Sequence, residues 1–214
     1  MYNAQTYQDL FVDKLLDIDN GYFVDIGAGT GGLPVYSTGF YSNTYFFESR
    51  GWQGLAIDYD QNYINSVNNS RTAKCILADL NFVNINTILE SNDCPLEIDY
   101  LSLDVDNAQW KVFNDFDFKK YTFKVMTLEH NLFQSFAECN QSHPIEHKNK
   151  IVKEHKEYRS KLQDLGYKIL WGNVILDGYG PVEDWYVNPE MYKKYKHLEK
   201  ENVNCKEVIN AIFR

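Results

Sequence analysis

The feature that most restricts the fold of this chain is a short apolar run, Tyr22–Ile26, that ends directly at a group of glycines. The apolar run predicts a buried strand. The next six residues, Gly27 to Gly32, read GAGTGG. Because glycine has no side chain, such a turn can adopt positive φ angles and lets a ligand approach the backbone closely. A buried strand that enters a glycine turn is typical of doubly wound α/β domains.

The rest of the chain alternates in the same way. Short apolar runs at 55–57, 74–78, 98–103 and 123–128 are separated by polar or helical segments, and apolar residues recur at helical spacing over 5–16 and 151–165. Strands that alternate with helices predict a mostly parallel sheet. Runs at 167–171, 173–176 and 185–187, with Gly172 between the first two, predict an antiparallel end to that sheet.

The length of 214 residues is that of one domain. We expect this domain to span residues 1–190 and the tail at 191–214 to be helical and packed on it. Apolar residues at Val208, Ile209, Ile212 and Phe213 fall on one face of the tail helix. That face predicts docking on the domain, with a homodimer contact as the alternative.

The charge balance excludes some partners. Lys and Arg number 21 against 30 Asp and Glu, a formal net charge of −9, which disfavours nucleic acid and anionic membranes. Asp9, Asp13 and Asp17 interrupt the first 19 residues, so neither a signal peptide nor a membrane span is expected there, and the expected location is the cytoplasm. The four cysteines form no CxxC pair and are expected to be free thiols.

The glycine turn fits two ligands. Its spacing satisfies GxGxxG, so an NAD-dependent oxidoreductase is one interpretation. However, Pro34 and Gly39 interrupt the helix that a pyrophosphate site needs. Asp25, just before the turn, would repel a pyrophosphate but suits the cationic sulfonium of S-adenosylmethionine. These residues favour S-adenosylmethionine.

Two further acids close the next predicted strands. Asp58 ends the second strand, where its carboxylate can accept both ribose hydroxyls. Asp79 ends the third and can accept from the adenine amino group, with apolar neighbours such as Leu80 against the ring. Acids at three successive strand ends are what an adenosine site needs, although each alone could cap a helix or a turn.

Several motifs together resemble those of the FkbM-type methyltransferases over about residues 5–190. They are QTYQDLFVDKLL (5–16), FVDIGAG (23–29), SNTYFFE (42–48), GWQGLAID (51–58), IDYLSLDVDNAQW (98–110), TLEHN (127–131) and EDWYVNPE (183–190). The resemblance implies a seven-stranded Rossmann-like methyltransferase fold, mostly parallel with an antiparallel C-terminal hairpin. It also implies methyl transfer to a hydroxyl, often on a sugar or a sugar-bearing natural product.

The strand-end residues and the resemblance together predict a set of residues for the S-adenosylmethionine site. They are Gln5, Asp25, Gly27, Ala28, Gly29, Asn43, Asp58, Tyr59, Asp79, Leu80 and Asp104. The chain departs from the family pattern at two places. It has Asp58-Tyr59 where relatives usually read Glu-Pro, and DVDN at 104–107 where they often read DVEG.

The acceptor side requires a base or a metal, because a sugar hydroxyl is a poor nucleophile. Asp104 and Asp106 follow the fourth predicted strand, and Glu129, His130 and Asn131 follow the fifth, so they should share one edge of the sheet. In one hypothesis Asp104, Glu129 and His130 hold a magnesium-like ion, and Asp106 or His130 takes the proton. In the other, His130 is the base without a metal, oriented by Asp104 or Glu129.

Other segments suit the acceptor. Residues 133–150 are expected to form a loop that could cover the substrate. Asp184, Trp185 and Tyr186 either offer aromatic faces to a sugar ring or belong to the core. A non-catalytic binding module that keeps the glycine turn is a further alternative.

Overall fold

The computed structural model of the chain describes residues 2–29, 41–67, 71–130, 132–135 and 144–212. Some residues singled out above lie outside these ranges: Gly32, Pro34, Gly39, Asn131 and Phe213.

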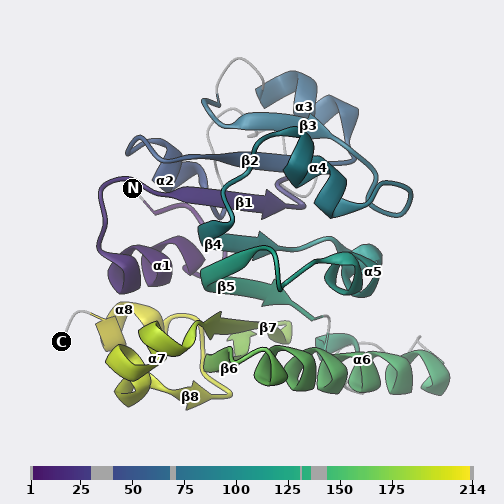
Figure 1. Cartoon of the computed structure of the whole chain (residues 1–214). Coiled ribbons are helices and arrows are strands. Elements are labelled where there is room, and N and C mark those ends of the chain that lie inside the picture. The colour runs from purple at the N-terminus through teal and green to yellow at the C-terminus, as the bar shows by residue number, and fades with distance from the viewer. Residues whose placement is uncertain (1, 30–40, 68–70, 131, 136–143, 213–214) are drawn as a thin grey trace.

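Within the described residues, the strands form one eight-stranded sheet in the order β3-β2-β1-β4-β5-β7-β6-β8 (Figure 1). The strands are β1 (Tyr22–Ile26), β2 (Gln53–Asp58), β3 (Lys74–Leu77), β4 (Glu97–Leu103), β5 (Thr122–Glu129), β6 (Lys168–Leu176), β7 (Gly180–Val187) and β8 (Lys200–Glu201). Strands β1 to β5 are parallel, and β7 is antiparallel to both β5 and β6. The predicted doubly wound sheet with an antiparallel end is confirmed.

The prediction of seven strands is wrong, because β8 adds a parallel pairing with β6 at Trp171–Lys200 and Gly172–Glu201. The prediction that Gly172 separates two strands is also wrong. The chain continues through a β-bulge, in which Asn173 has a φ of 49° and the register with β7 shifts. A Cβ at Gly172 would lie 2.4 Å from Oε1 of Glu201, so the glycine leaves room for that carboxylate beside the strand.

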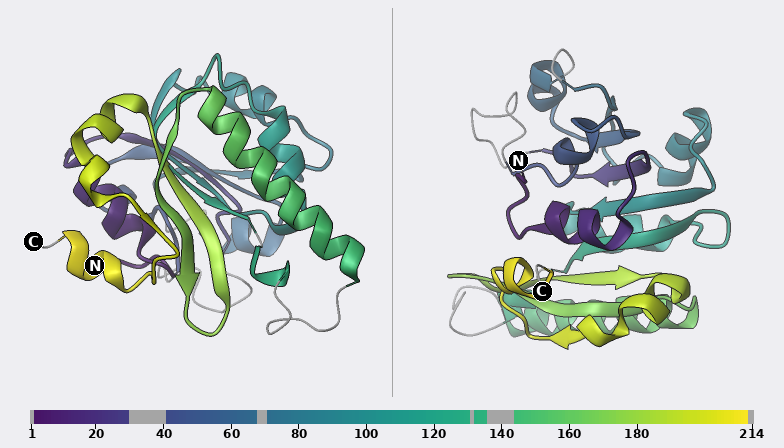
Figure 2. Two further views of the ribbon diagram at one scale, coloured as in Figure 1. Left: turned by 90° about the horizontal axis from the view of Figure 1, so that it is seen from below. Right: turned by 90° about the vertical axis from the view of Figure 1, so that its left-hand side faces the viewer.

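Helices cover both faces of the sheet, which gives three layers (Figure 2). One face carries α1 (Gln8–Leu16), α2 (Tyr45–Glu48), α7 (Pro189–Tyr195) and α8 (Glu207–Ile212). The other carries α4 (Ile85–Ser91), α5 (Gln109–Asp115) and α6 (Ile145–Asp164). Helix α3 (Gln61–Val67) packs beside β2 and β3. Short 3-10 turns are η2 (Asp106–Ala108), η3 (Leu132–Ser135) and η4 (Lys196–Leu198).

The core under α1 is built around stacked aromatic rings. Trp171 and Trp185 stack with ring centroids 5.5 Å apart, and Phe11 of α1 lies 4.5 Å from Trp185. All three side chains are fully buried, and Tyr186 is buried on the opposite face. Of the two interpretations of Trp185 and Tyr186, the core is therefore the one that the structure confirms.

Helix α6 begins at Ile145, six residues before the predicted start, so the expectation of a loop up to residue 150 is wrong. Pro144 stands at its N-cap, and proline is tolerated at a helix start because the first backbone N–H groups have no helical partner. The predicted end is confirmed, since Gly166 follows the helix with a φ of +93°.

The C-terminal segment returns to the domain. Val208 of α8 is fully buried in the core that contains α1, whereas the neighbouring Ile209 is 39% exposed. No helix in the described part of the chain is long and apolar enough to cross a bilayer.

Candidate functional site

The parallel strands end along one edge of the sheet, where ligands of open α/β folds bind. The register aligns Ile26 of β1 with Ile57 of β2 and with Leu103 of β4. Leu103 in turn pairs with Leu128 of β5. The next residue in each strand or turn is one of the predicted site residues, namely Gly27, Asp58, Asp104 and Glu129. The structure thus places these four along the same edge.

The glycine turn is held by hydrogen bonds to β2 and packs closely against the end of β4. The backbone N–H groups of Gly27 and Ala28 donate to the carbonyl of Ile57, at 2.9 and 3.2 Å. Gly27 has a φ of +82°, and a Cβ on it would lie 1.6 Å from the carbonyl oxygen of Asp104. Only glycine fits at this position. The turn therefore presents bare backbone at the edge of the sheet.

Asp58 is buried beside the turn. Its Oδ2 accepts the N–H of Gly29 at 2.7 Å, and its Oδ1 accepts the N–H of Asp60 at 2.8 Å. Burial raises the pKa of this carboxyl. Each carboxylate oxygen has two lone pairs, so both can also accept a hydroxyl from a ligand. Tyr59, which follows, is 76% exposed.

Asp79 and Leu80 lie after β3, on the far side of β2 from the glycine turn. Oδ1 of Asp79 accepts the N–H of Asn81 at 2.9 Å, which is the turn-capping role that an isolated Asp can play. Leu80 is buried, so only part of its surface can meet a ligand. The adenine contact of Asp79 stays a prediction.

Asp25 lies inside β1 and belongs to a buried polar network. It accepts the hydroxyl of Thr44 at 2.6 Å, and that hydroxyl also accepts from Arg71 at 3.0 Å. Arg71 is paired with Glu48 at 2.6 Å. Burial raises the pKa of Asp25. In this structure the carboxyl supports the segment between Ser42 and Glu48, and its predicted contact with a sulfonium stays a prediction.

Asn43 contacts β4, and the N-terminal segment runs beside it. The side-chain amide of Asn43 donates to the buried hydroxyl of Ser102 on β4, at 3.0 Å. Ala4 forms an isolated parallel bridge with Tyr41, so the segment containing Gln5 runs beside residues 41–44. Gln5 itself is exposed.

Acids gather where β4 and β5 end. Asp104 and Asp106 are exposed, and Glu129 is half-buried beside them. Burial, followed by the negative charge of Asp104 and a hydrogen bond with it, raises the pKa of Glu129 well above its usual value. The proximity of Asp104 therefore makes the carboxylate of Glu129 a stronger base than that of an isolated glutamate.

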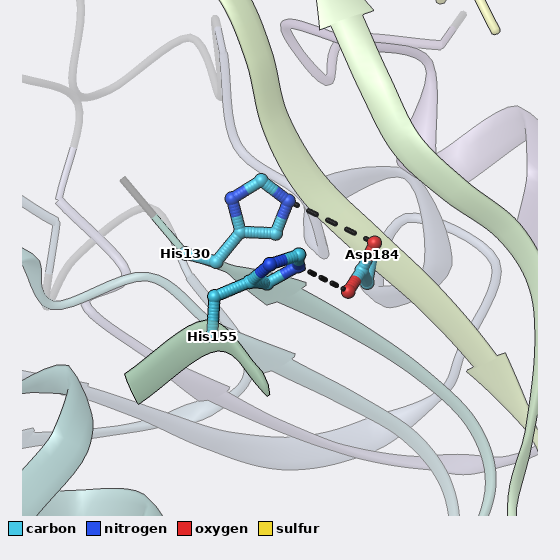
Figure 3. Close-up of side chains that lie close together, drawn as sticks. All are labelled: His130, His155 and Asp184. Atoms are coloured by element: carbon cyan, nitrogen blue, oxygen red, sulfur yellow. Dashed lines mark hydrogen bonds and ion pairs between the residues drawn. The ribbon is translucent and has the colours of Figure 1, made fainter. Parts of the chain in front are cut away.

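His130 is drawn into a different cluster (Figure 3). Its Nε2 lies 3.7 Å from Oδ1 of Asp184 on β7, and Nε2 of His155 on α6 lies 3.0 Å from Oδ2 of the same carboxylate. Burial lowers the pKa of His130 to about 3, so the ring is neutral at pH 7. Burial alone would raise the pKa of Asp184, but its contacts with His130, His155 and Arg159 hold that pKa below its usual range.

Among the described residues, His130, His155 and Asp184 are the group of three whose ligand atoms lie within 4.8 Å of one another. Two contacts oppose a metal ion there. Arg159 donates to both oxygens of Asp184, at 2.8 and 2.6 Å. Nδ1 of His130 accepts the N–H of Leu132 at 3.2 Å, whereas a metal-bound histidine donates from its second nitrogen. The cluster is therefore a buried ion-pair network.

Glu129 and His130 also line a cavity of about 10 Å³, which is the size of one water. Within the described ranges, Oε2 of Glu129 and Nε2 of His130 are the buried side-chain atoms without a hydrogen-bond partner. A water in this cavity could accept from His130 and donate to Glu129. In this structure the ring of His130 is turned toward Asp184. An ion held by Asp104, Glu129 and His130 stays a prediction.

Glu183 is a site residue that the sequence did not single out. It is buried on β7 opposite Glu129, and its Oε1 accepts both Thr6 Oγ1 and Gln8 Nε2 at 2.6 Å. Burial raises the pKa of Glu183 to about 7. Its place in the sequence next to Asp184 and Trp185 was the one available sign of a role in the site. Its partners Thr6 and Gln8 are too far away in the sequence to be recognised as its neighbours.

The Methyltransferase FkbM domain family matches residues 79–169, from just after β3 into β6. The resemblance predicted from the motifs is thereby confirmed for this segment. Comparison with curated proteins finds no match.

Two solved structures share the fold. One is a "putative caffeoyl-CoA O-methyltransferase" from Staphylococcus aureus, with a TM-score of 0.51 and 15% identity over 85% of this chain and 82% of that one. The other is a "putative O-methyltransferase" from Klebsiella pneumoniae, with a TM-score of 0.52 and 10% identity over 86% and 81%. At such identities the likeness shows the fold alone. The matched family and the fold together support S-adenosylmethionine-dependent methyl transfer.

Proposed function

We propose that this chain is an O-methyltransferase that moves a methyl group from S-adenosylmethionine to a hydroxyl of a sugar or glycan. The observation that carries the proposal is the common edge at which the glycine turn and Asp58 stand beside the paired acids Asp104 and Glu129. One half of this edge suits an adenosine, and the other half suits removal of a proton from an acceptor.

The donor half fits S-adenosylmethionine. The turn at Gly27 and Gly29 leaves no side chain in the way, and the oxygens of Asp58 retain lone pairs for ribose hydroxyls. The buried network of Asp25, Thr44 and Arg71 holds the segment that contains Asn43, whose amide donates to Ser102 on β4. When bound, the cofactor supplies an electrophilic methyl group. The chain has to hold this methyl group in line with the acceptor oxygen and exclude water from the site.

The acceptor half offers a base. Burial and the neighbouring Asp104 raise the pKa of Glu129, which makes its carboxylate a stronger base for the proton of a hydroxyl. Glu129 is favoured for this role over His130, since His130 is buried with its Nδ1 already accepting an N–H. Asp106, exposed at the start of η2, is the other acid within this half.

The proposal is tested with labelled S-adenosylmethionine and a panel of free sugars, nucleotide sugars and glycans, with products read by mass. We expect Glu129→Gln to lower kcat by about 10²–10⁴-fold while the affinity for S-adenosylmethionine stays within about twofold. Glu97→Gln is the matched control, because Glu97 is exposed at the opposite end of β4. Transfer by Glu129→Gln at the rate of the unaltered chain would refute Glu129 as the base.

Two further experiments distinguish this proposal from a metal-dependent mechanism and from an NAD-dependent oxidoreductase. Chelator treatment, with and without added magnesium, leaves activity unchanged if the carboxyl pair acts alone and abolishes it if an ion is required. Calorimetry with NAD against S-adenosylmethionine tests the oxidoreductase. Tight binding of S-adenosylmethionine without transfer to any acceptor would instead support a binding module. The net charge of −9 favours a neutral acceptor, with neither nucleic acid nor an anionic membrane as partner.

A further inference from the structure

Gln109, the first residue of α5, places its side-chain amide between the ends of β4 and β5. Its Nε2 donates to the carbonyl of Leu103 at 3.1 Å and to the carbonyl of Glu129 at 2.6 Å. Its Oε1 accepts the N–H of Val105 at 3.1 Å. The side chain is buried. The nitrogen and the oxygen of one buried amide are thus both bonded to backbone at the edge of the sheet.

These bonds continue the connection between β4 and β5 beyond their last aligned pair. That pair is Leu103 with Leu128. Beyond it, the amide of Gln109 joins the carbonyl of Leu103, which ends β4, to the carbonyl of Glu129, which ends β5. Asp104 follows Leu103 directly. The amide therefore sets the distance between the two backbone positions that carry the site acids.

The backbone around Asp104 is held by the same amide and by the glycine turn. Gln109 bonds the carbonyl of the residue before Asp104 and the N–H of the residue after it. The N–H of Asp104 donates to the carbonyl of Ile26 at 2.9 Å, and its own carbonyl oxygen would lie 1.6 Å from a Cβ on Gly27. The glycine turn and Asp104 are therefore one connected piece of backbone, which the side chain of Gln109 links to Glu129.

The turn after β4 depends on such a link because its backbone is strained. Asp106 has a φ of 47°, in the left-handed region that residues other than glycine seldom adopt. A strained conformation persists only where the surrounding structure holds it. The bond from the N–H of Val105 to Gln109 lies directly before Asp106 and provides this support.

We propose that Gln109 is a positioning residue for methyl transfer, whose amide fixes Glu129 relative to Asp104 and to the glycine turn at which the methyl donor binds. The inference rests on the proposed function, in which Glu129 takes the proton of the acceptor hydroxyl. Gln109 acts through Glu129, because its own polar atoms are buried and bonded to backbone. Misplacement of a reacting group by about 1 Å can cost about 100-fold in rate.

The first test replaces the amide by an apolar side chain of the same length. Gln109→Met removes all three bonds, so we expect kcat with labelled S-adenosylmethionine to fall by about 10–100-fold. The Kd of S-adenosylmethionine should stay within about threefold, because the glycine turn is also bonded to Ile57. Gln109→Glu, which keeps the oxygen that accepts Val105 but lacks the amide donor, should show the same loss of kcat.

Asn92→Leu is the matched control. The amide of Asn92 donates to the carbonyl of Ile88 at 2.7 Å, where α4 ends and shortly before β4 begins. Loss of a hydrogen bond from a side-chain amide to backbone should lower the urea midpoint in both Asn92→Leu and Gln109→Met. Only Gln109→Met should lower kcat.

A double substitution shows whether Gln109 acts through Glu129. In the Glu129→Gln chain, which has already lost the base, the addition of Gln109→Met should lower kcat by less than about twofold. Losses of kcat that multiply in the double variant would overturn the proposal. A kcat of Gln109→Met equal to that of the unaltered chain would overturn it as well.

Two NMR measurements test the link without turnover. In Gln109→Met, compared with Asn92→Leu, the N–H of Val105 should exchange with deuterium at least about tenfold faster, and the carboxyl ¹³C resonance of Glu129 should shift. No change in either would overturn the proposal even if methyl transfer is confirmed. An unaltered chain that methylates no acceptor would refute the proposed function, and with it the role of Gln109 in catalysis, whatever the exchange at Val105.

Discussion

Replacement of Gly27 by alanine should damage the fold far more than the size of one methyl group implies. The new Cβ would lie 1.6 Å from the carbonyl oxygen and 2.6 Å from the carbonyl carbon of Asp104. Both of these atoms belong to backbone, so no side-chain rotation relieves the overlap. The turn would have to move away from the end of β4, which also strains the bonds that Gly27 and Ala28 donate to Ile57.

The magnitude has two parts that a matched variant separates. Alanine at positive φ costs about 1–2 kcal/mol wherever it occurs. Gly51 has a φ of +93° and no atom within 4 Å of its built Cβ, so Gly51→Ala should show this part alone. Gly27→Ala adds overpacking of about 1–3 kcal/mol. Its total of about 2–5 kcal/mol is a large share of the usual stability of a domain.

Thermal unfolding followed by circular dichroism measures both variants. For a chain of this size, we expect Gly27→Ala to lower Tm by about 5–15 °C, and Gly51→Ala by about 2–6 °C. Calorimetry should also show loss of S-adenosylmethionine binding in Gly27→Ala only. Equal destabilisation by the two substitutions would refute the packing argument and leave backbone strain as the whole effect.

Three further predictions follow from the site and the core. Asp58→Asn retains the shape but loses the charge, so titration calorimetry should show S-adenosylmethionine binding weakened by about 10–100-fold, whereas an unchanged affinity would remove Asp58 from the site. The raised pKa of Glu183, about 7, means that the folded state retains a proton that the unfolded state releases above about pH 4.5. The contribution of Glu183 to the free energy of unfolding, up to about 3 kcal/mol, is present below pH 4.5 and is lost as the pH rises through 7. The urea midpoint of Glu183→Gln should lose this dependence on pH. Parallel profiles of urea midpoint against pH for the two proteins would contradict the assignment. Trp185→Ala leaves a void between Trp171 and Phe11 and should cost about 3–5 kcal/mol in urea unfolding, a value that a loss below about 1 kcal/mol would rule out.

The sequence predicted the parallel half of the fold well, because each strand there is a short apolar run with a clear end. β1 has the predicted bounds, and β2 to β5 differ from the predictions by one or two residues at an end. The antiparallel half was harder. A glycine in a strand can mark a break or a bulge, and the pairing of Gly172 with Glu201 depends on a segment about 30 residues further along.

The site shows the same division. Gly27, Asp58, Asp104 and Glu129 share an edge because strand ends are readable from the sequence. The partners of His130 were not readable, because Asp184 and His155 reach it from β7 and from α6. The side-chain network around Asp25 was equally hidden, since Arg71 comes from a segment 46 residues away that has no motif of its own.

The hydrogen bonds from Thr6 and Gln8 to Glu183 span 177 and 175 positions of the chain. During synthesis the segment with Thr6 and Gln8 therefore leaves the ribosome well before β7, and it cannot form these bonds until that strand has emerged. At ordinary translation rates of about 5–20 residues per second, this delay is roughly 10–35 seconds. Over that interval the apolar face of α1 has no Trp185 to cover it, which makes the nascent chain a candidate for holdase chaperones until β7 emerges.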